Sequence, residues 1–122
     1  MILEELTDKI IGAAIEVHKT LGPGLLESIY ETALCYEMEQ LGLPFERQQG
    51  LPVLYKGQNL GEFRVDLVVD KQVVVELKSV ERHDPVFEAQ ILSYMRLGSF
   101  RVGLLINFNT SLLKNGIRRF VL

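Results

Sequence analysis

Two carboxylates and a lysine interrupt two apolar runs near the middle of the chain. Asp66 stands in the run that ends at Val69, and Glu76 and Lys78 stand in the run that begins at Val73. A carboxylate in a buried strand is costly unless a cation, a metal ion or several hydrogen-bond donors accompany it. Paired carboxylates that hold a divalent metal ion, with a lysine beside them, are suited to hydrolysis of a phosphodiester.

The spacing of these residues predicts one shared site. Side chains alternate across a strand, so Glu76 and Lys78 lie on one face, roughly 7 Å apart. If residues 70–72 form a three-residue hairpin loop, the register places Asp66 opposite Glu76. Opposed side chains are about 5 Å apart at Cβ, and two carboxylates that close repel unless a cation lies between them. The alternate side chains of the same runs are assigned to the core: Val65, Leu67, Val69, Val73, Val75 and Leu77.

The composition predicts one globular domain over residues 1–122. The chain is 48% hydrophobic and 24% charged, and it is long enough to bury a core. No run approaches the roughly 20 apolar residues of a membrane span, and the acidic start has no signal-peptide pattern. The single cysteine, Cys35, predicts a buried structural thiol and a reducing, cytoplasmic location. The net charge of −3 disfavours tight non-specific binding to nucleic acid, although a metal site itself contributes acidic residues.

The remaining elements form a framework for the candidate site. Helices are predicted over residues 6–21, with Thr7 or Asp8 as the cap, over residues 25–41, and from Pro85 to Leu97 with Asp84 as the cap. Strands are predicted over residues 51–55, 60–69, 73–80 and 101–108, with a turn at 56–58 and a last short strand at 117–122. This order predicts an α/β fold, a mixed β-sheet flanked by helices, with the strands at 73–80 and 101–108 joined by a helical crossover.

The motifs resemble those of a known superfamily. Asp66 followed by Glu76-x-Lys78 resembles the core motif of the PD-(D/E)XK nuclease superfamily. Gln90 and Tyr94 match the Q-x-x-x-Y signature of its RecB-like branch, and residues four apart on a helix share a face. The resemblance implies a restriction-endonuclease-like core with the order α-α-β-β-β-α-β. Val65 stands where the motif's name has proline.

A third segment narrows the resemblance. Gly24, Glu27 and Tyr30 form G-x-x-E-x-x-Y, which looks like the motif of the GxxExxY protein family within the same superfamily. Residues 11–18, 21–24 and 103–108 resemble that family as well. The superfamily pattern includes an acidic residue on the first core helix. Glu27 is the match, and Glu31, one turn later, competes with it.

The resemblance implies a role for each matching residue. Glu27, Asp66 and Glu76 would hold one or two Mg²⁺ or Mn²⁺ ions, and Lys78 would position or activate the attacking water or neutralise developing charge. Gln90 would orient a metal-bound water or a phosphate. Tyr94 is also a catalytic candidate and would form a hydrogen bond nearby.

The substrate implied by the resemblance is DNA or RNA, without a choice between them. Arg64 and His83 are candidates for substrate contacts, and residues 47–49 are further candidates for phosphate contacts. So small a nuclease is also compatible with a homodimer or a larger complex.

Plainer interpretations stand beside these. A cross-strand salt bridge on a solvated sheet face would account for Asp66, Glu76 and Lys78, and the helix dipole favours a glutamate such as Glu27 in a first turn. Gln90 and Tyr94 would then be a polar pair at a helix edge, His18 a capped core or interface histidine, and His83 an exposed loop residue. The sequence therefore leaves open a metal-dependent nuclease, a catalytically silent binding or assembly module, and an enzyme acting on another phosphate or carbonyl substrate.

Overall fold

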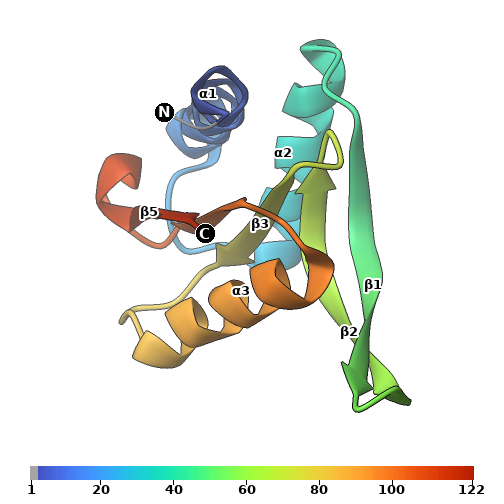
Figure 1. The fold of residues 1–122 in the computed structure, drawn as a ribbon. Coiled ribbons are helices and arrows are strands. Elements are labelled where there is room, and N and C mark those ends of the chain that lie inside the picture. The colour runs from blue at the N-terminus through green and yellow to red at the C-terminus, as the bar shows by residue number, and fades with distance from the viewer. Residues whose placement is uncertain (1–2) are drawn as a thin grey trace.

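A computed structural model describes residues 3–122 and confirms the predicted α/β order (Figure 1). The elements are α1 (Glu4–Leu21), α2 (Glu27–Gln40), β1 (Phe45–Tyr55), β2 (Gln58–Val69), β3 (Val73–Lys78), α3 (Pro85–Gly98), β4 (Val102–Asn107), a short 3-10 helix η1 (Leu113–Gly116) and β5 (Ile117–Val121). Within the described residues, no helix is long and apolar enough to cross a membrane.

The strands form one mixed, five-stranded sheet in the order β1-β2-β3-β4-β5. β3 and β4 are parallel and are connected through α3, as predicted, whereas the other neighbours are antiparallel. The loop between β2 and β3 reverses the chain through residues 70–72, so that Val69 pairs with Val73. This is the register predicted from the sequence.

Helices cover both faces of the sheet and produce two cores. On one face, side chains of α1 and α2 such as Ile10 and Leu34 pack against Leu67, Val75 and Leu104. On the other face, α3 contributes the buried pair Ile91 and Met95, which pack against Leu51, Val65, Val68, Val74 and Leu105. The site described below lies between these two layers.

The prediction that Val65 shares the core face of Leu67 is wrong. Val65 packs in the α3 core together with Val68, so the alternation of faces along β2 is interrupted between Val65 and Leu67. The interruption coincides with an irregularity in the partner strand: Gln48 has a positive φ of 50°, and the β1–β2 pairing omits the Gln48–Asp66 position. Asp66 therefore sits where the strand changes face.

Several element boundaries also differ from the prediction. α1 begins at Glu4, so the two predicted caps lie inside it, and Thr7 donates its hydroxyl proton to the Glu4 carbonyl instead. β1 begins at Phe45, because the polar stretch before Leu51 pairs with β2. The third helix begins as predicted, since the Asp84 carboxylate accepts the Val86 N–H at 2.9 Å.

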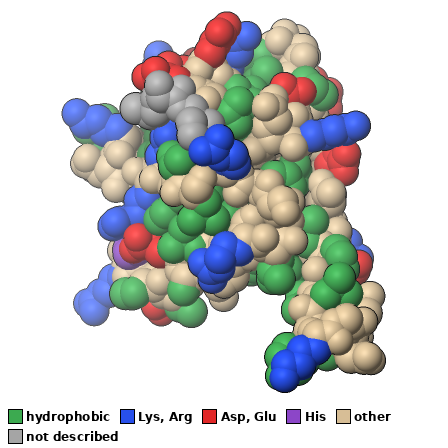
Figure 2. All heavy atoms as spheres, in the orientation of Figure 1, with side chains coloured by type: hydrophobic (Ala, Val, Ile, Leu, Met, Phe, Trp, Pro, Cys, Tyr) green, Lys and Arg blue, Asp and Glu red, His purple; other side chains and the backbone are tan. Residues whose placement is uncertain are grey.

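The β1–β2 hairpin extends beyond the core as an arm (Figures 1 and 2). Its turn is a two-residue loop, Lys56 and Gly57, and both residues have positive φ, which suits a tight hairpin. Side chains near the tip such as Leu54, Tyr55 and Leu60 are exposed. The arm therefore contributes little to the core, and its inner half carries the residues of the site.

Candidate active site

The pairing of β2 with β3 ends at the point where the two carboxylates stand. Beyond the Leu67–Val75 pair, side-chain carboxylates accept the hydrogen bonds of the backbone N–H groups in place of backbone carbonyls. The Asp66 N–H donates to Glu76 Oε1 at 3.0 Å, and the Leu77 N–H donates to Asp66 Oδ2 at 2.8 Å. Each carboxylate is thus held by the backbone of the neighbouring strand, and the two acids are fixed side by side.

Glu76 is the more strongly perturbed of the two acids. Its side chain is buried, and burial together with the negative charge of Asp66 raises the pKa of Glu76 to about 8. The Asp66 N–H and the Lys78 ammonium act in the opposite direction but do not cancel these effects. A carboxylate pair in this state would be relieved by a bound cation.

Lys78 does not form the salt bridge of the plainer interpretation. Its ammonium lies over the ring of Phe87, 4.5 Å from the ring centroid. Among residues 3–122, no carboxylate oxygen lies within 4.0 Å of Lys78 Nζ. The lysine is positioned by an aromatic ring on α3 and keeps its charge available to a ligand.

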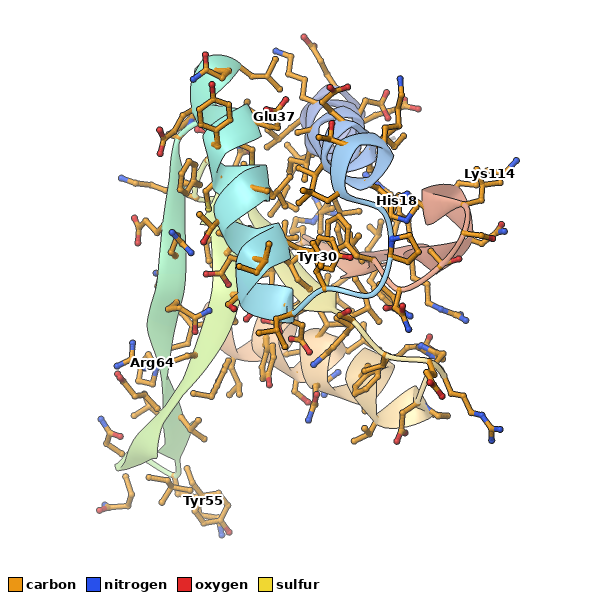
Figure 3. The ribbon with its side chains drawn as sticks, turned by 180° about the vertical axis from the view of Figure 1, so that it is seen from behind. His18, Tyr30, Glu37, Tyr55, Arg64 and Lys114 are labelled. Carbon is orange, nitrogen blue, oxygen red and sulfur yellow. The ribbon has the colours of Figure 1, made fainter. Side chains whose placement is uncertain are left out.

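The G-x-x-E-x-x-Y segment builds the turn that delivers Glu27 to the start of α2. Tyr30 donates its hydroxyl proton to the Gly22 carbonyl at 2.5 Å and accepts the Leu25 N–H at 3.1 Å. Gly24 has a φ of +100°, a conformation that side-chain-bearing residues rarely adopt. Figure 3 shows Tyr30 pointing from α2 toward this turn. The glycine and the tyrosine of the motif are therefore structural, and the glutamate is the member that faces the site.

Glu27 lies within electrostatic reach of the site. Partial burial raises its pKa, Lys78 lowers it, and Asp66 raises it again, while the Ser79 backbone donates a hydrogen bond to it. The Ser79 hydroxyl also donates to the Leu25 carbonyl at 2.6 Å and so ties the turn to the end of β3.

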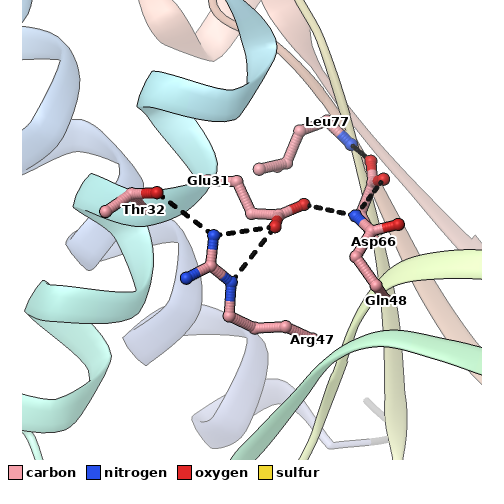
Figure 4. Close-up of polar contacts among 6 residues, drawn as sticks. All are labelled: Glu31, Thr32, Arg47, Gln48, Asp66 and Leu77. Atoms are coloured by element: carbon pink, nitrogen blue, oxygen red, sulfur yellow. Dashed lines mark hydrogen bonds and ion pairs between the residues drawn. The ribbon is translucent and has the colours of Figure 1, made fainter.

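Glu31, the competing acid on α2, is committed to other partners (Figure 4). Its buried carboxylate accepts hydrogen bonds from Arg47 at 3.0 and 3.1 Å and from Gln48 Nε2 at 2.8 Å. The same Gln48 nitrogen lies 3.3 Å from Asp66 Oδ1. Glu31 thus braces the irregular part of β1 against Asp66, and Arg47, expected as a phosphate contact, is used in this brace.

The two α3 candidates are placed differently. The Tyr94 ring stacks on Phe63 with centroids 4.4 Å apart, and its hydroxyl is close enough to the acids that burial, Glu76 and Asp66 all raise its pKa. Gln90, one turn earlier, is exposed, and its side chain has no hydrogen-bond partner among the described residues. The catalytic roles of both residues stay predictions.

The two candidates for substrate contact lie at the margins of the site. Arg64 is exposed and donates from Nη1 to the Gln48 carbonyl at 3.0 Å. His83 lies in the loop before α3, where Nε2 is 2.6 Å from Glu88 Oε2 and the ring meets Phe87 edge-on. In contrast, His18 is a capped core histidine, as the plainer interpretation predicted, with Nε2 2.7 Å from the Thr110 carbonyl.

Sequence reasoning missed Ser79 and Phe87, which shape the site, and it considered Gln48 only as a candidate for phosphate contacts. Gln48 links the acid of α2 to Asp66, Ser79 fastens the Glu27 turn, and Phe87 holds the lysine. Ser79 could have been suspected because it directly follows Lys78. The other two owe their places to tertiary packing and carry no local signal.

Comparison with protein families agrees with this geometry. A model of the PD-(D/E)XK nuclease superfamily matches residues 4–120, which span all the helices and strands described above except the last residue of β5. The chain belongs to the PD-(D/E)XK nuclease superfamily. Comparisons with curated proteins and with solved structures gave no match. The membership places the Asp66, Glu76 and Lys78 cluster in a fold that is known for nuclease activity.

Nucleases of the PD-(D/E)XK superfamily generally use divalent metal ions. The pair Asp66 and Glu76 fits such an ion, because Mg²⁺ is commonly bound by one or two carboxylates together with water and substrate phosphates. The mutual repulsion of the two acids is the observation that favours a cation between them. Across residues 3–122, however, no group of three or more His, Cys, Asp or Glu residues is arranged to hold a metal ion. The participation of Glu27 as a third ligand therefore stays a prediction.

Proposed function

We propose that this protein is a metal-dependent nuclease that hydrolyses phosphodiester bonds of DNA or RNA. The observation that carries the proposal is the Asp66 and Glu76 pair, in which each carboxylate is held by the backbone of the other strand where β2 and β3 separate. Beside the pair lies Lys78, which has no ion-pair partner among residues 3–122. Two acids placed side by side in this way do not stabilise the sheet. Membership of the superfamily supports the same reaction class.

Each residue has a defined part in the proposed reaction. Asp66 and Glu76 would hold Mg²⁺ or Mn²⁺, which supplies a reactive water and stabilises charge on the phosphate when it is bound. The Lys78 ammonium would offset negative charge that develops on the phosphate. The Tyr94 hydroxyl can donate a hydrogen bond at the edge of the acid pair. Glu27 would complete the ligand set from α2.

Narrower assignments belong to the same proposal. The turn built by Gly24 and Tyr30 gives the G-x-x-E-x-x-Y motif a structural purpose, which supports membership of the GxxExxY family. Gln90, Arg64 and His83 would contact the substrate from the margins of the site. We also propose a cytoplasmic location and a homodimer or larger complex as the working form.

The test is cleavage of labelled single-stranded DNA, duplex DNA and RNA in Mn²⁺ or Mg²⁺. We expect the wild-type protein to cut at least one substrate and a chelator to abolish cutting. Lys78→Ala and Asp66→Asn should lose activity, by about 100-fold or more for loss of a charge-stabilising group. Lys71→Ala, a matched control in the exposed loop between β2 and β3, should cut at the wild-type rate. Cutting by Lys78→Ala at that rate would refute the assignment.

A catalytically silent module is the second candidate, and one observation favours it: the described residues do not form a three-ligand metal group. A silent module would show no change in melting temperature on addition of Mn²⁺. A functional site should bind the ion in the folded state alone and raise the melting temperature by mass action, and Asp66→Asn should abolish the increase.

A further inference from the structure

A small pocket adjoins Lys78 at the carboxyl ends of β3 and β4. Its volume is about 50 Å³, and its polar lining comes from Lys78, His83, Asn107, Asn115 and Arg118. Lys78 and Asn107 are the last residues of the two parallel strands and are paired in register. In open α/β sheets, the carboxyl ends of parallel strands are where ligands bind.

The charges around this pocket favour an anion. Lys78 and Arg118 contribute two cations. Glu88 lies beside the pocket, 2.6 Å from His83 Nε2 and 3.8 Å from Arg118 Nη1. The residues that line the pocket include these two cations and no carboxylate, whereas Glu27 and Glu76 act on Lys78 from the side of the acid pair. Figure 2 shows basic, acidic and histidine side chains gathered beside the start of α3.

The walls of the pocket are fixed before any ligand arrives. Asn107 exchanges hydrogen bonds with both the N–H and the carbonyl of Val80, at 3.1 and 3.0 Å, and so anchors the loop after β3. Gly116 packs so tightly on the Asn107 carbonyl that a Cβ there would collide with it. The Asn115 side chain makes no hydrogen bond within residues 3–122 and is available to a ligand.

The size restricts the ligand to a small group. One ordered water needs roughly 10–15 Å³, so about 50 Å³ accommodates a few heavy atoms, as in a phosphate, but not a nucleoside. If the pocket held an internal phosphodiester, the nucleic-acid chain would have to leave it in two directions. A terminal phosphate monoester is attached to the chain on one side only. The monoester also carries the greater negative charge.

We propose that this pocket binds the terminal phosphate of a nucleic-acid strand. The inference rests on the proposed nuclease function and names the end of the substrate that the site recognises. Arg118 would bind the phosphate through its guanidinium fork, and Lys78 would lie between this phosphate and the acid pair. Strands with a phosphorylated end would then be bound and cut in preference to strands with a hydroxyl end.

The first arm of the test uses inorganic phosphate alone, in the absence of divalent metal. Amide NMR shifts should move saturably at Lys78, Asn115 and Gly116 in the wild-type protein. Arg118→Gln should weaken binding by about tenfold, as expected for loss of one charge-assisted contact. Arg96→Gln, a matched control on the exposed side of α3, should bind as the wild type does. If Arg118→Gln does not fold, Asn115→Asp serves instead, because the added negative charge should repel the ion.

The second arm separates free phosphate from a phosphorylated end. Matched oligonucleotides that differ only in a terminal phosphate or hydroxyl are compared for binding to the wild-type protein and to Arg118→Gln. We expect the phosphorylated strand to bind about tenfold more tightly to the wild type and the preference to vanish in the variant. No saturable phosphate binding, or phosphate binding without an end preference, would overturn the inference.

The two proposals can fail separately. An end preference without any cleavage would support the pocket and count against the nuclease. Cleavage without an end preference would support the nuclease and remove the pocket from the account.

Discussion

At the scale of single residues, the fold works against the ionisation of Glu76. The carboxylate is buried, faces Asp66, and accepts a hydrogen bond from the Asp66 N–H at 3.0 Å. Such an arrangement costs stability when the metal is absent. The two adjacent acids are therefore better explained by binding of a positively charged ligand than by a contribution to folding.

The stability of the metal-free protein should therefore fall as Glu76 ionises. The folded-state pKa is about 8 and the ordinary value is 4.5, so between these values the folded state holds a proton that the unfolded state has lost. This contribution favours folding at low pH and is lost as the pH rises toward 8. Urea unfolding in chelator from pH 5 to pH 9 should show the decline, and Glu76→Gln should flatten it. Glu46→Gln, on an exposed part of β1, should leave the decline in place. An equal decline in Glu76→Gln would contradict the account.

At the scale of elements, the site is assembled by turns as much as by strands. The Tyr30 hydroxyl bridges the Gly22 carbonyl and the Leu25 N–H, and its ring stacks on Phe108 with centroids 4.4 Å apart. One buried side chain thereby fixes the end of α1, the start of α2 and the orientation of Glu27.

Removal of the Tyr30 hydroxyl should loosen the turn without creating a cavity in the core. Tyr30→Phe keeps the stacked ring but leaves buried polar groups unpaired, which should cost about 1–3 kcal/mol in the free energy of unfolding. We expect cleavage to fall as well, because Glu27 loses its fixed position. Tyr36→Phe is the matched control, since Tyr36 is 59% exposed on the same helix. Urea unfolding and cleavage rates measure both effects. A Tyr30→Phe protein with wild-type stability and activity would show that the turn is held by other contacts.

The elements that were predictable are those specified by local signals. The Asp84 and Pro85 pair specified the start of α3, and a three-residue loop specified the register that places Asp66 across from Glu76. The start of β1 was not predictable, because residues 45–50 are mostly polar and become a strand only by pairing with β2. The change of face at Asp66 depends on a partner strand with an irregular residue, Gln48, and such long-range effects leave no local pattern.

At the scale of the whole molecule, the charge distribution limits how nucleic acid can be bound. The chain has 13 basic and 16 acidic residues, so the surface as a whole repels a polyanion. Near the site, Arg47 is held by Glu31 at 3.0 Å, whereas Arg64 and Arg118 have looser ion pairs, at 3.9 Å with Glu62 and 3.8 Å with Glu88. Together with Lys78, these two arginines are the cations that we expect to meet phosphates. Binding should depend on these few contacts and on metal ions, and only weakly on long-range attraction.

The salt dependence of binding should reflect this small number of contacts. If three cations meet phosphates of duplex DNA, the slope of log K against log salt is about −3, whereas six to ten contacts give a much steeper dependence. The slope can be measured from 50 to 200 mM salt with Asp66→Asn, which we expect to bind the duplex without cutting it. Arg64→Gln should make the slope shallower by about one unit, and Lys71→Gln, a control away from the site, should not change it. A slope of about −6 or steeper would show that more cations than these three residues contact the phosphates. The DNA would then extend from the carboxyl ends of β3 and β4 along the hairpin arm, which carries Lys56 at its tip.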